Sequence, residues 1–306
     1  MMMRSACGVL LLGLILVMTV GCGGSGGKKS GSGASLSSQY KKLLKESNPN
    51  TRARGLVALS KKQEKAKDSD GATKSLGEAL KSCEDIENAE QQAGAYTSVG
   101  LAYGERGEKG TTRKVMKKAR TATDKIEDID AKATSLVEMA MVQSKVGQKD
   151  WAPAHLKDVE KLTKQIKSPN NRVRLLVRAA QAYQRVEDVK ESDRVFSAAV
   201  ETANGIEAID RRSEALLMIA VGQTKLKKKS AAMATFDEAV ELARQVEKPE
   251  LRANLLIDVA LKLRGASKKS KVKKLLDEAE KIAKTIKAPD LQKEVNARIN
   301  DERKRT

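Results

Sequence analysis

The sequence predicts an all-α protein, an α-solenoid of about six antiparallel helical hairpins. Three observations lead to this fold class: a composition that favours helices, a repeat of 40 residues without insertions, and two helical patterns in each repeat. The chain has 306 residues, of which 40% are hydrophobic, 32% are charged and only 2% are aromatic. Side chains such as Ala, Leu, Lys and Glu lose little conformational freedom in a helix. Because the apolar content is moderate, we expect narrow stacked cores rather than one wide interior.

The repeat is most visible at one short segment that returns every 40 residues. It reads IENAE at 86–90, IEDID at 126–130, IKSPN at 166–170, IEAID at 206–210, VEKPE at 246–250 and IKAPD at 286–290. Four of the five prolines lie at this phase, and proline marks a break because it cannot continue a helix interior. The residue after the proline position is Asn or acidic, which suits a helix start. We therefore expect these residues to cap the first helix of each repeat: Asn50, Glu90, Asp130, Asn170, Asp210, Glu250 and Asp290.

Each repeat carries two apolar stripes with helical spacing. The first stripe of the fourth repeat runs Val173, Leu176, Val177, Ala180, Tyr183. A polar gap such as 147–150 or 227–230 follows, and a second stripe then appears, as in Phe236, Ala239, Ala243, Val246. Offsets of three, four and seven place such residues on one helix face. Each repeat is therefore expected to be a helical hairpin.

These residues resemble the tetratricopeptide repeat (TPR). The first-helix pattern of that family is matched by Tyr96, Val99, Gly100 and Tyr103, with Gly107 at the expected turn, and the second-helix pattern by Ala232, Phe236 and Ala239. The resemblance covers residues 50 to about 290 and implies a right-handed solenoid whose first helices line a concave groove. The family unit is about 34 residues long, so the extra residues here are expected to lengthen the second helix. HEAT-like repeats, which also run near 40 residues, are the alternative fold.

The sequence divides the chain into three parts. Residues 1–21 are expected to form a lipoprotein signal peptide, 22–34 a Gly/Ser-rich flexible tether, and 35–306 the TPR-like repeat domain. Repeats are expected near 50–89, 90–129, 130–169, 170–209, 210–249 and 250–289, with a half-unit helix at 35–46 and a capping helix at 290–304. Polar terminal units of this kind stop solenoids from stacking end to end.

The N-terminus has the pattern of a secretory signal. A short basic start with Arg4 precedes an apolar run, 6–20, and then Gly21 and Cys22. The run is short for a membrane span. Its end resembles bacterial lipoprotein signals, which implies lipid attachment at Cys22, although Thr19 stands where that family prefers Leu. The expected location is the bacterial cell envelope, facing the periplasm or exterior. Gly23 favours an outer membrane if the organism has one; an uncleaved N-terminal anchor is the alternative.

No residue cluster indicates catalysis. The single histidine, His155, is expected to be a partly exposed helix residue, and Cys83, the one cysteine of the repeat domain, a small buried side chain. Neither a phosphate-binding glycine loop nor a dinucleotide fingerprint is present. We therefore expect no enzyme activity, no cofactor and no metal site.

The expected function is a protein–protein interaction scaffold that binds an unidentified protein or peptide on its concave face. One column of basic residues, Lys65, Lys145, Arg185 and Lys225, occupies the groove-facing phase, where the second repeat has Glu105. Such a column suits acidic groups or a C-terminal carboxylate, and a purely solubilising role is equally compatible with it. The net charge of +19 and the basic runs 227–229 and 268–274 suggest an alternative, binding to an anionic envelope polymer or membrane surface. Because stacking aromatics are scarce, no nucleic-acid partner is expected.

Overall fold

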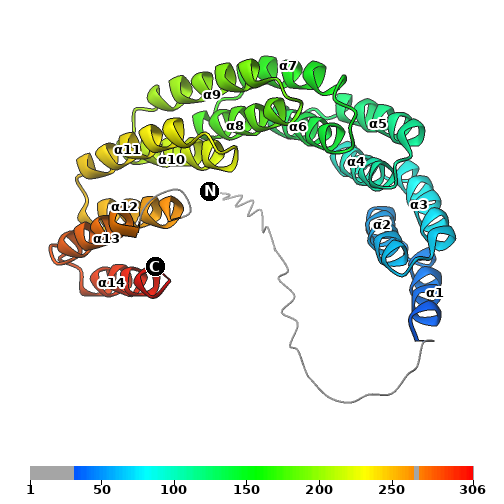
Figure 1. The fold of residues 1–306 in the computed structure, drawn as a ribbon, viewed down its shortest axis with the longest axis horizontal. Coiled ribbons are helices and arrows are strands. Elements are labelled where there is room, and N and C mark those ends of the chain that lie inside the picture. Colours follow the sequence, from blue (N-terminus) through cyan, green and yellow to red (C-terminus); the bar gives the residue numbers. More distant parts are fainter. Residues whose placement is uncertain (1–30, 265–268, 306) are drawn as a thin grey trace, which may run out of the picture.

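The structure is a computed structural model that describes residues 31–264 and 269–305, and within these ranges it contains fourteen helices and no strand. The helices form an open arc (Figure 1). Their bounds are α1 Gly31–Leu44, α2 Pro49–Lys65, α3 Ser69–Glu84, α4 Ala89–Glu105, α5 Lys109–Asp124, α6 Ile129–Lys145, α7 Ala152–Thr163, α8 Pro169–Arg185, α9 Val189–Asn204, α10 Ile209–Lys225, α11 Lys229–Gln245, α12 Pro249–Leu263, α13 Lys269–Ala283 and α14 Pro289–Lys304. None of these helices is both long and apolar enough to cross a membrane.

The helices pair into hairpins, and this confirms the α-solenoid. Each even-numbered helix from α2 to α12 packs most extensively on the helix that follows it. The even-numbered helices also pack on one another, α2 on α4 and so on to α14, and they lie on the inner side of the arc (Figure 1). We call them the inner helices, and α3, α5, α7, α9, α11 and α13 the outer helices. The closer contacts among the inner helices bend the stack toward them.

The core is a continuous seam between the inner and outer helices. Its buried side chains form two clusters, one from α2 to α6 and one from α6 to α14. Small residues hold the helices close: Ala72, Ala79, Ala232 and Ala239 are fully buried. Cys83 is likewise fully buried, as predicted. The outer helices differ in length: α11 has 17 residues and continues past Ala239 to Gln245, whereas α7 has 12.

The predicted capping residues were wrong by two positions. The N-cap is the residue before the proline position: Asn48, Asn88, Asp128 and Ser168 accept a hydrogen bond from the backbone N–H three residues later. Proline therefore stands at the first helical position, where the missing N–H costs no helical hydrogen bond. The residues predicted as caps, Asn50, Glu90, Asp130, Asn170, Asp210, Glu250 and Asp290, lie in the first turn instead. There an acidic group still interacts favourably with the positive end of the helix dipole.

The turn from inner to outer helix has one fixed backbone shape. Lys67, Gly107, Gly147, Glu187 and Lys227, each 40 residues apart, all have φ between 59° and 79°. In each turn the next N–H bonds to a carbonyl five residues back, as in Lys228 to Gln223 at 3.1 Å. This left-handed closure satisfies the last carbonyls of the inner helix.

Several consecutive hairpins are joined by a polar side chain near the start of the inner helix. Gln92 donates to the carbonyl of Cys83 at 3.1 Å, Lys132 to that of Asp124 at 2.9 Å, and Arg212 to that of Ile206 at 2.8 Å. These donors satisfy carbonyls left free where the preceding outer helix ends.

The solenoid begins with α1, which packs on α2 through Leu36, Tyr40 and Leu43. It starts at Gly31, inside the segment 22–34 expected to be a tether. The signal peptide, Cys22 and the rest of the tether lie outside the described residues. At the other end α14 buries Val295 and Ile299 and presents a polar outer face.

Candidate functional site

A pocket opens on the concave face where α8, α10 and α12 meet. It has a volume of about 360 Å³. Its apolar lining residues are Val177, Leu217, Met218 and Val221. Four cationic residues, Arg174, Arg178, Lys225 and Lys262, also line it, with Glu214 as the one acidic residue. An apolar floor with a cationic rim can hold an apolar side chain that is flanked by carboxylates.

The charges at this pocket are largely uncompensated. In the part of the chain that the structure describes, Arg174, Lys225 and Lys262 form no ion pair, whereas Arg178 pairs with Glu138 at 3.3 Å. The pocket's carboxylate, Glu214, pairs with Arg211 at 3.2 Å rather than with these cations. Helix α8 itself has four arginines and no acidic residue. This stretch of the concave face therefore attracts anionic groups.

Gly222 sets the depth of the pocket. A Cβ atom at Gly222 would lie 2.5 Å from Cγ1 of Val177 and 3.3 Å from Nε2 of Gln181. Since real Cβ contacts are longer, only glycine allows α10 to approach α8 this closely. The close approach leaves the tips of Val177 and Val221 at the base of the pocket.

The four residues of the predicted basic column lie in different environments. Lys65, Lys145, Arg185 and Lys225 are all exposed, and each is the last residue of an inner helix. At this position a cation interacts favourably with the negative end of the helix dipole. The regular spacing of these residues therefore has a structural reason. Of the four, only Lys225 lines the α8–α10–α12 pocket.

Lys145 is engaged by the neighbouring hairpin. Its Nζ atom lies 2.5 Å from a carboxylate oxygen of Glu105, and Lys61 reaches the other oxygen at 3.3 Å. Burial alone would raise the pKa of Glu105, but hydrogen bonds from Lys145 and Lys61 outweigh it and hold the pKa below its usual range. Lys145 is therefore less available to a ligand than the predicted column implied.

Sequence reasoning missed three lining residues, Arg174, Arg178 and Lys262. Arg174 and Arg178 lie at half-buried positions within α8, and Lys262 is exposed in the last turn of α12. The signal that could have found the two arginines is the composition of α8, with Arg at positions 172, 174, 178 and 185 and no acidic residue.

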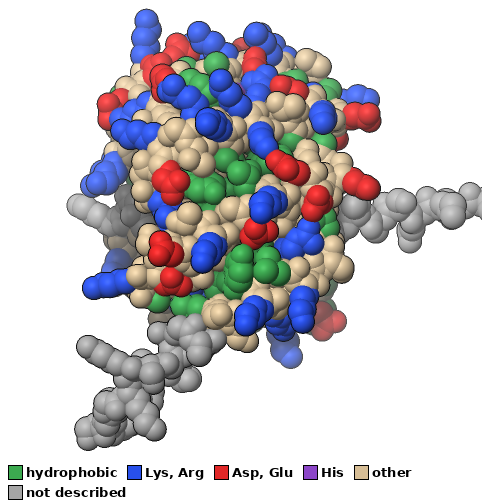
Figure 2. All heavy atoms as spheres, turned by 90° about the vertical axis from the view of Figure 1, so that its right-hand side faces the viewer, with side chains coloured by type: hydrophobic (Ala, Val, Ile, Leu, Met, Phe, Trp, Pro, Cys, Tyr) green, Lys and Arg blue, Asp and Glu red, His purple; other side chains and the backbone are tan. Residues whose placement is uncertain are grey.

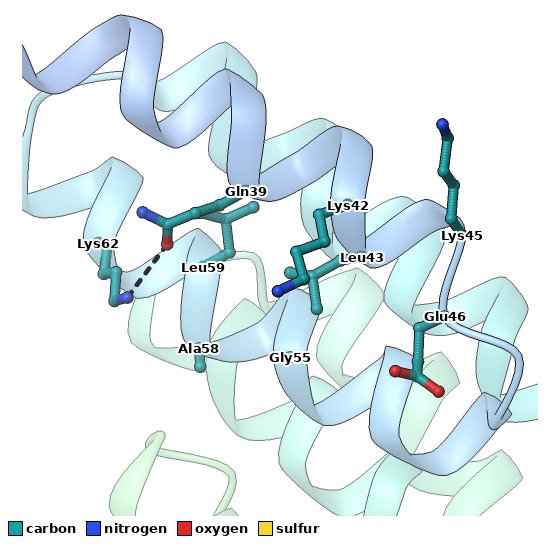
Figure 3. A pocket seen from close by; sticks show the side chains of 9 residues that line it. All are labelled: Gln39, Lys42, Leu43, Lys45, Glu46, Gly55, Ala58, Leu59 and Lys62. Atoms are coloured by element: carbon teal, nitrogen blue, oxygen red, sulfur yellow. Dashed lines mark hydrogen bonds between the residues drawn. The ribbon is translucent and has the colours of Figure 1, made fainter.

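Two further hollows have a different character. A pocket of about 480 Å³ between α2, α4 and α6 is lined mostly by polar residues, including Arg54, Glu90 and Glu138. Another, of about 530 Å³, lies at the N-terminal end between α1 and α2 (Figure 3). There Lys62 donates to Gln39 at 3.2 Å, and a Cβ at Gly55 would clash with the side chain of Leu43. The first has no apolar floor. The second combines apolar residues with lysines, but it lies at the N-terminal end of the arc and not between three inner helices of the concave face.

The histidine and the cysteine of the repeat domain are both buried. His155 was expected to be partly exposed, but this was wrong: only 6% of it is accessible. The helix α7 begins at Ala152, later than its counterparts, but His155 keeps the repeat position that is also buried at Ser75 and Thr235. Burial, reinforced by the charge of Arg120, lowers the pKa of His155 to about 4.

Burial also raises the pKa of the Cys83 thiol to about 12, so the thiolate is disfavoured. Within residues 31–264 and 269–305 no group of three or more potential metal ligands is assembled.

Comparison with known proteins gives structural likeness only. No protein-family model matches the sequence, and no curated protein matches it. Among solved structures, Ton1535 from Thermococcus onnurineus NA1 aligns with a TM-score of 0.40 at 12% identity over 85% of this chain and 94% of that one. The kinesin light chain TPR-like repeats of Podosopora anserina align with a TM-score of 0.42 at 14% identity, over 64% of this chain and 96% of theirs. A Rap protein complexed with Competence and Sporulation Factor aligns with a TM-score of 0.36 at 14% identity, over 88% of this chain and 80% of that one. At such low scores the fold assignment rests on the hairpins of the chain itself.

Proposed function

We propose that this protein is a lipid-anchored scaffold outside the cytoplasm that binds a protein partner on its concave face. The observation that carries the proposal is the pocket between α8, α10 and α12, with its apolar floor and three cations that lack acidic partners among the described residues. The partner is an acidic peptide segment or protein surface that places one apolar side chain in the pocket.

Preformation supports this mode of binding. The pocket is built on three packed helices, so little ordering is needed when a partner arrives. Arg174 and Arg178 are half-buried on α8, and their planar groups suit bidentate contacts to carboxylates. The cations at the rim give selectivity for acidic segments, and the apolar floor adds affinity.

The envelope location is supported by the N-terminal sequence. The apolar run 6–20 followed by Gly21 and Cys22 is typical of an exported lipoprotein. A tether rich in Gly and Ser then leads to α1. Anchoring would hold the scaffold at a membrane while its groove faces the surrounding compartment.

Site-specific photocrosslinking tests the proposal. A benzoylphenylalanine in place of Met218 lies in the pocket, whereas the same group in place of the exposed Val189 lies on an outer helix. We expect the Met218 probe to give a discrete crosslinked protein in envelope extract, and the Val189 probe to give none of that product. Adding Arg174→Glu and Lys225→Glu should abolish the crosslink. If the same product forms from both probes, or survives the charge reversals, the concave pocket is not the binding site.

A further inference from the structure

The outer helix α5 has a charge that sets it apart from most of its counterparts. It contains six Lys and Arg residues and a single acidic residue, Asp124. By contrast, α3, α7, α9 and α11 each contain at least as many acidic as basic residues. Figure 2, which views the molecule from the right-hand side of Figure 1, shows many Lys and Arg side chains on this face, interspersed with fewer Asp and Glu. The basic character of α5 is therefore not a general property of the solvated outer surface.

Half of the α5 cations have no acidic partner in the described part of the chain. Lys118 pairs with Glu84 at 2.5 Å, Arg113 with Asp150 at 3.4 Å, and Arg120 with two aspartates. No ion pair there involves Lys109, Lys114 or Lys117, and all three side chains are exposed. They occupy successive turns of one helix, so they form a line of positive charge on the outside of the arc.

A single aromatic side chain adjoins this line. Trp151, the only tryptophan of the chain, immediately precedes α7 and is half-buried. Its ring centroid lies 5.1 Å from Cζ of Arg113 and 5.6 Å from Nζ of Lys117. The turn that carries it is held against α5, because Gln148 donates to the carbonyl of Lys109 at 2.9 Å. The indole and the cations therefore belong to one rigid surface.

This combination selects among anionic partners. These cations are exposed to solvent, so a small anion would stay largely hydrated there and would gain little. A single-stranded nucleic acid would need several stacking aromatics, and this surface has one. A line of lysines beside an indole is instead suited to a lipid headgroup layer, where cations meet phosphates and the amphipathic ring lies at the interface.

We infer that the α5 face, formed by Lys109, Arg113, Lys114, Lys117 and Trp151, docks on the surface of an anionic phospholipid bilayer. The choice of a bilayer over a soluble polyanion rests on the lipid anchor of the proposed function, which would keep this face near a membrane. Since α5 lies on the outside of the arc, docking there leaves the concave face turned away from the lipid and open to a partner (Figure 1).

The fluorescence of Trp151 allows a test that reports on this surface alone. The full chain is mixed with vesicles of phosphatidylcholine alone, or of phosphatidylcholine and phosphatidylglycerol in equal parts, and tryptophan emission and acrylamide quenching are recorded. Because there is one tryptophan, the signal reports this surface whether or not the N-terminus also inserts. We expect a blue shift and reduced quenching only with phosphatidylglycerol, both reversed by high salt.

Matched charge variants complete the test. The triple variant Lys109→Gln, Lys114→Gln, Lys117→Gln should lose the shift. The control Lys273→Gln, Lys274→Gln, Lys281→Gln removes the same charge from exposed positions of α13 and should keep it. Circular dichroism verifies that both variants remain folded. The inference is overturned if the α5 variant keeps the shift, if phosphatidylcholine produces it equally, or if soluble polyphosphate produces it without vesicles. Crosslinking through Met218 is read separately, so failure of the concave site leaves this result interpretable.

Discussion

Nδ1 of His155 lies 3.0 Å from Oε1 of Gln143, and the pair is buried between α6 and α7. Since the amide oxygen is an acceptor, the imidazole donates through Nδ1. The same bridge recurs two repeats away on either side: Ser75 donates to Gln63 at 2.7 Å, and Thr235 donates to Gln223 at 3.0 Å. In the repeats between them, Tyr103 and Tyr183 occupy the glutamine position. At this core position glutamine and tyrosine therefore alternate through the first five repeats, and the sixth has Leu263.

The buried imidazole predicts a loss of stability in mild acid. An unfolded histidine has a pKa of about 6.5, whereas burial, with a further effect of Arg120, lowers that of folded His155 to about 4 despite the opposing Asp158 and Asp124. Because the folded pKa is the lower one, the stabilising contribution is complete above pH 6.5 and is lost as the pH falls toward 4. The loss is on the order of 3 kcal/mol, since one pKa unit corresponds to about 1.4 kcal/mol.

The measurement is the free energy of unfolding by urea at several pH values, for the wild type and for His155→Thr, which copies Thr235. We expect the wild type to lose more stability than the variant between pH 6.5 and 4. The untagged protein has one histidine, so NMR can follow its imidazole resonance directly. Equal pH dependence of the two proteins, or titration near pH 6.5 in the folded state, would contradict the assignment.

We predict that the effect of one added methyl group on stability depends strongly on which glycine receives it, and that Gly222 is a sensitive position. The Cβ of Gly222→Ala would lie 2.5 Å from Cγ1 of Val177, so α8 and α10 must separate. We expect a loss of about 1–3 kcal/mol in unfolding free energy. The matched control is Gly77→Ala on α3, where an added Cβ meets nothing within 4 Å. This control should be stabilising by up to about 1 kcal/mol, since alanine favours helices. Thermal unfolding of both variants distinguishes packing from helix propensity; a neutral Gly222→Ala would refute the close approach.

Two substitutions at equivalent turn positions are expected to change the stability of the protein in opposite directions. Lys227 has φ 59°, a conformation that is strained for a side chain, whereas Gly147 has φ 76° at the equivalent position. We expect Lys227→Gly to stabilise the protein by about 0.5–1 kcal/mol and Gly147→Ala to destabilise it by about 1–2 kcal/mol. Differential scanning calorimetry would show shifts of the melting temperature in opposite directions. Shifts of the same sign would mean that the turn relaxes in one of the two proteins.

The repeat itself was readable from the sequence because its cause is local. Apolar spacing, the proline phase and Gly107 each depend on the residue and its neighbours within one helix turn, and the predicted hairpins follow from them. The capping residues were misplaced because proline was interpreted as a break. In fact it begins the helix, and Asn48 and its counterparts are the caps.

The concave site was less accessible to sequence reasoning because it depends on several hairpins at once. The column ending in Lys225 follows from helix periodicity, but the uncompensated charge of Arg174 depends on where acidic residues of other helices lie. The engagement of Lys145 by Glu105 likewise spans two hairpins. The burial of His155, by contrast, could have been predicted, because the equivalent positions in the other repeats, Ser75, Val115, Val195, Thr235 and Leu275, are buried as well.

The final prediction concerns lipid attachment at Cys22. In a bacterial host the mature chain should begin at this residue and carry acyl chains, so the mass of the N-terminal peptide should exceed that of the bare sequence. Cys22→Ala should remove the added mass, and the protein should be retained as the unprocessed precursor. Two controls separate this thiol from the others: Cys7→Ser alters the apolar run that cleavage would remove, and Cys83→Ala alters a buried side chain of the repeat domain. Both should retain the lipid. An unchanged mass together with an unchanged membrane fraction for Cys22→Ala would exclude lipid anchoring, and would leave an uncleaved apolar segment as the means of attachment.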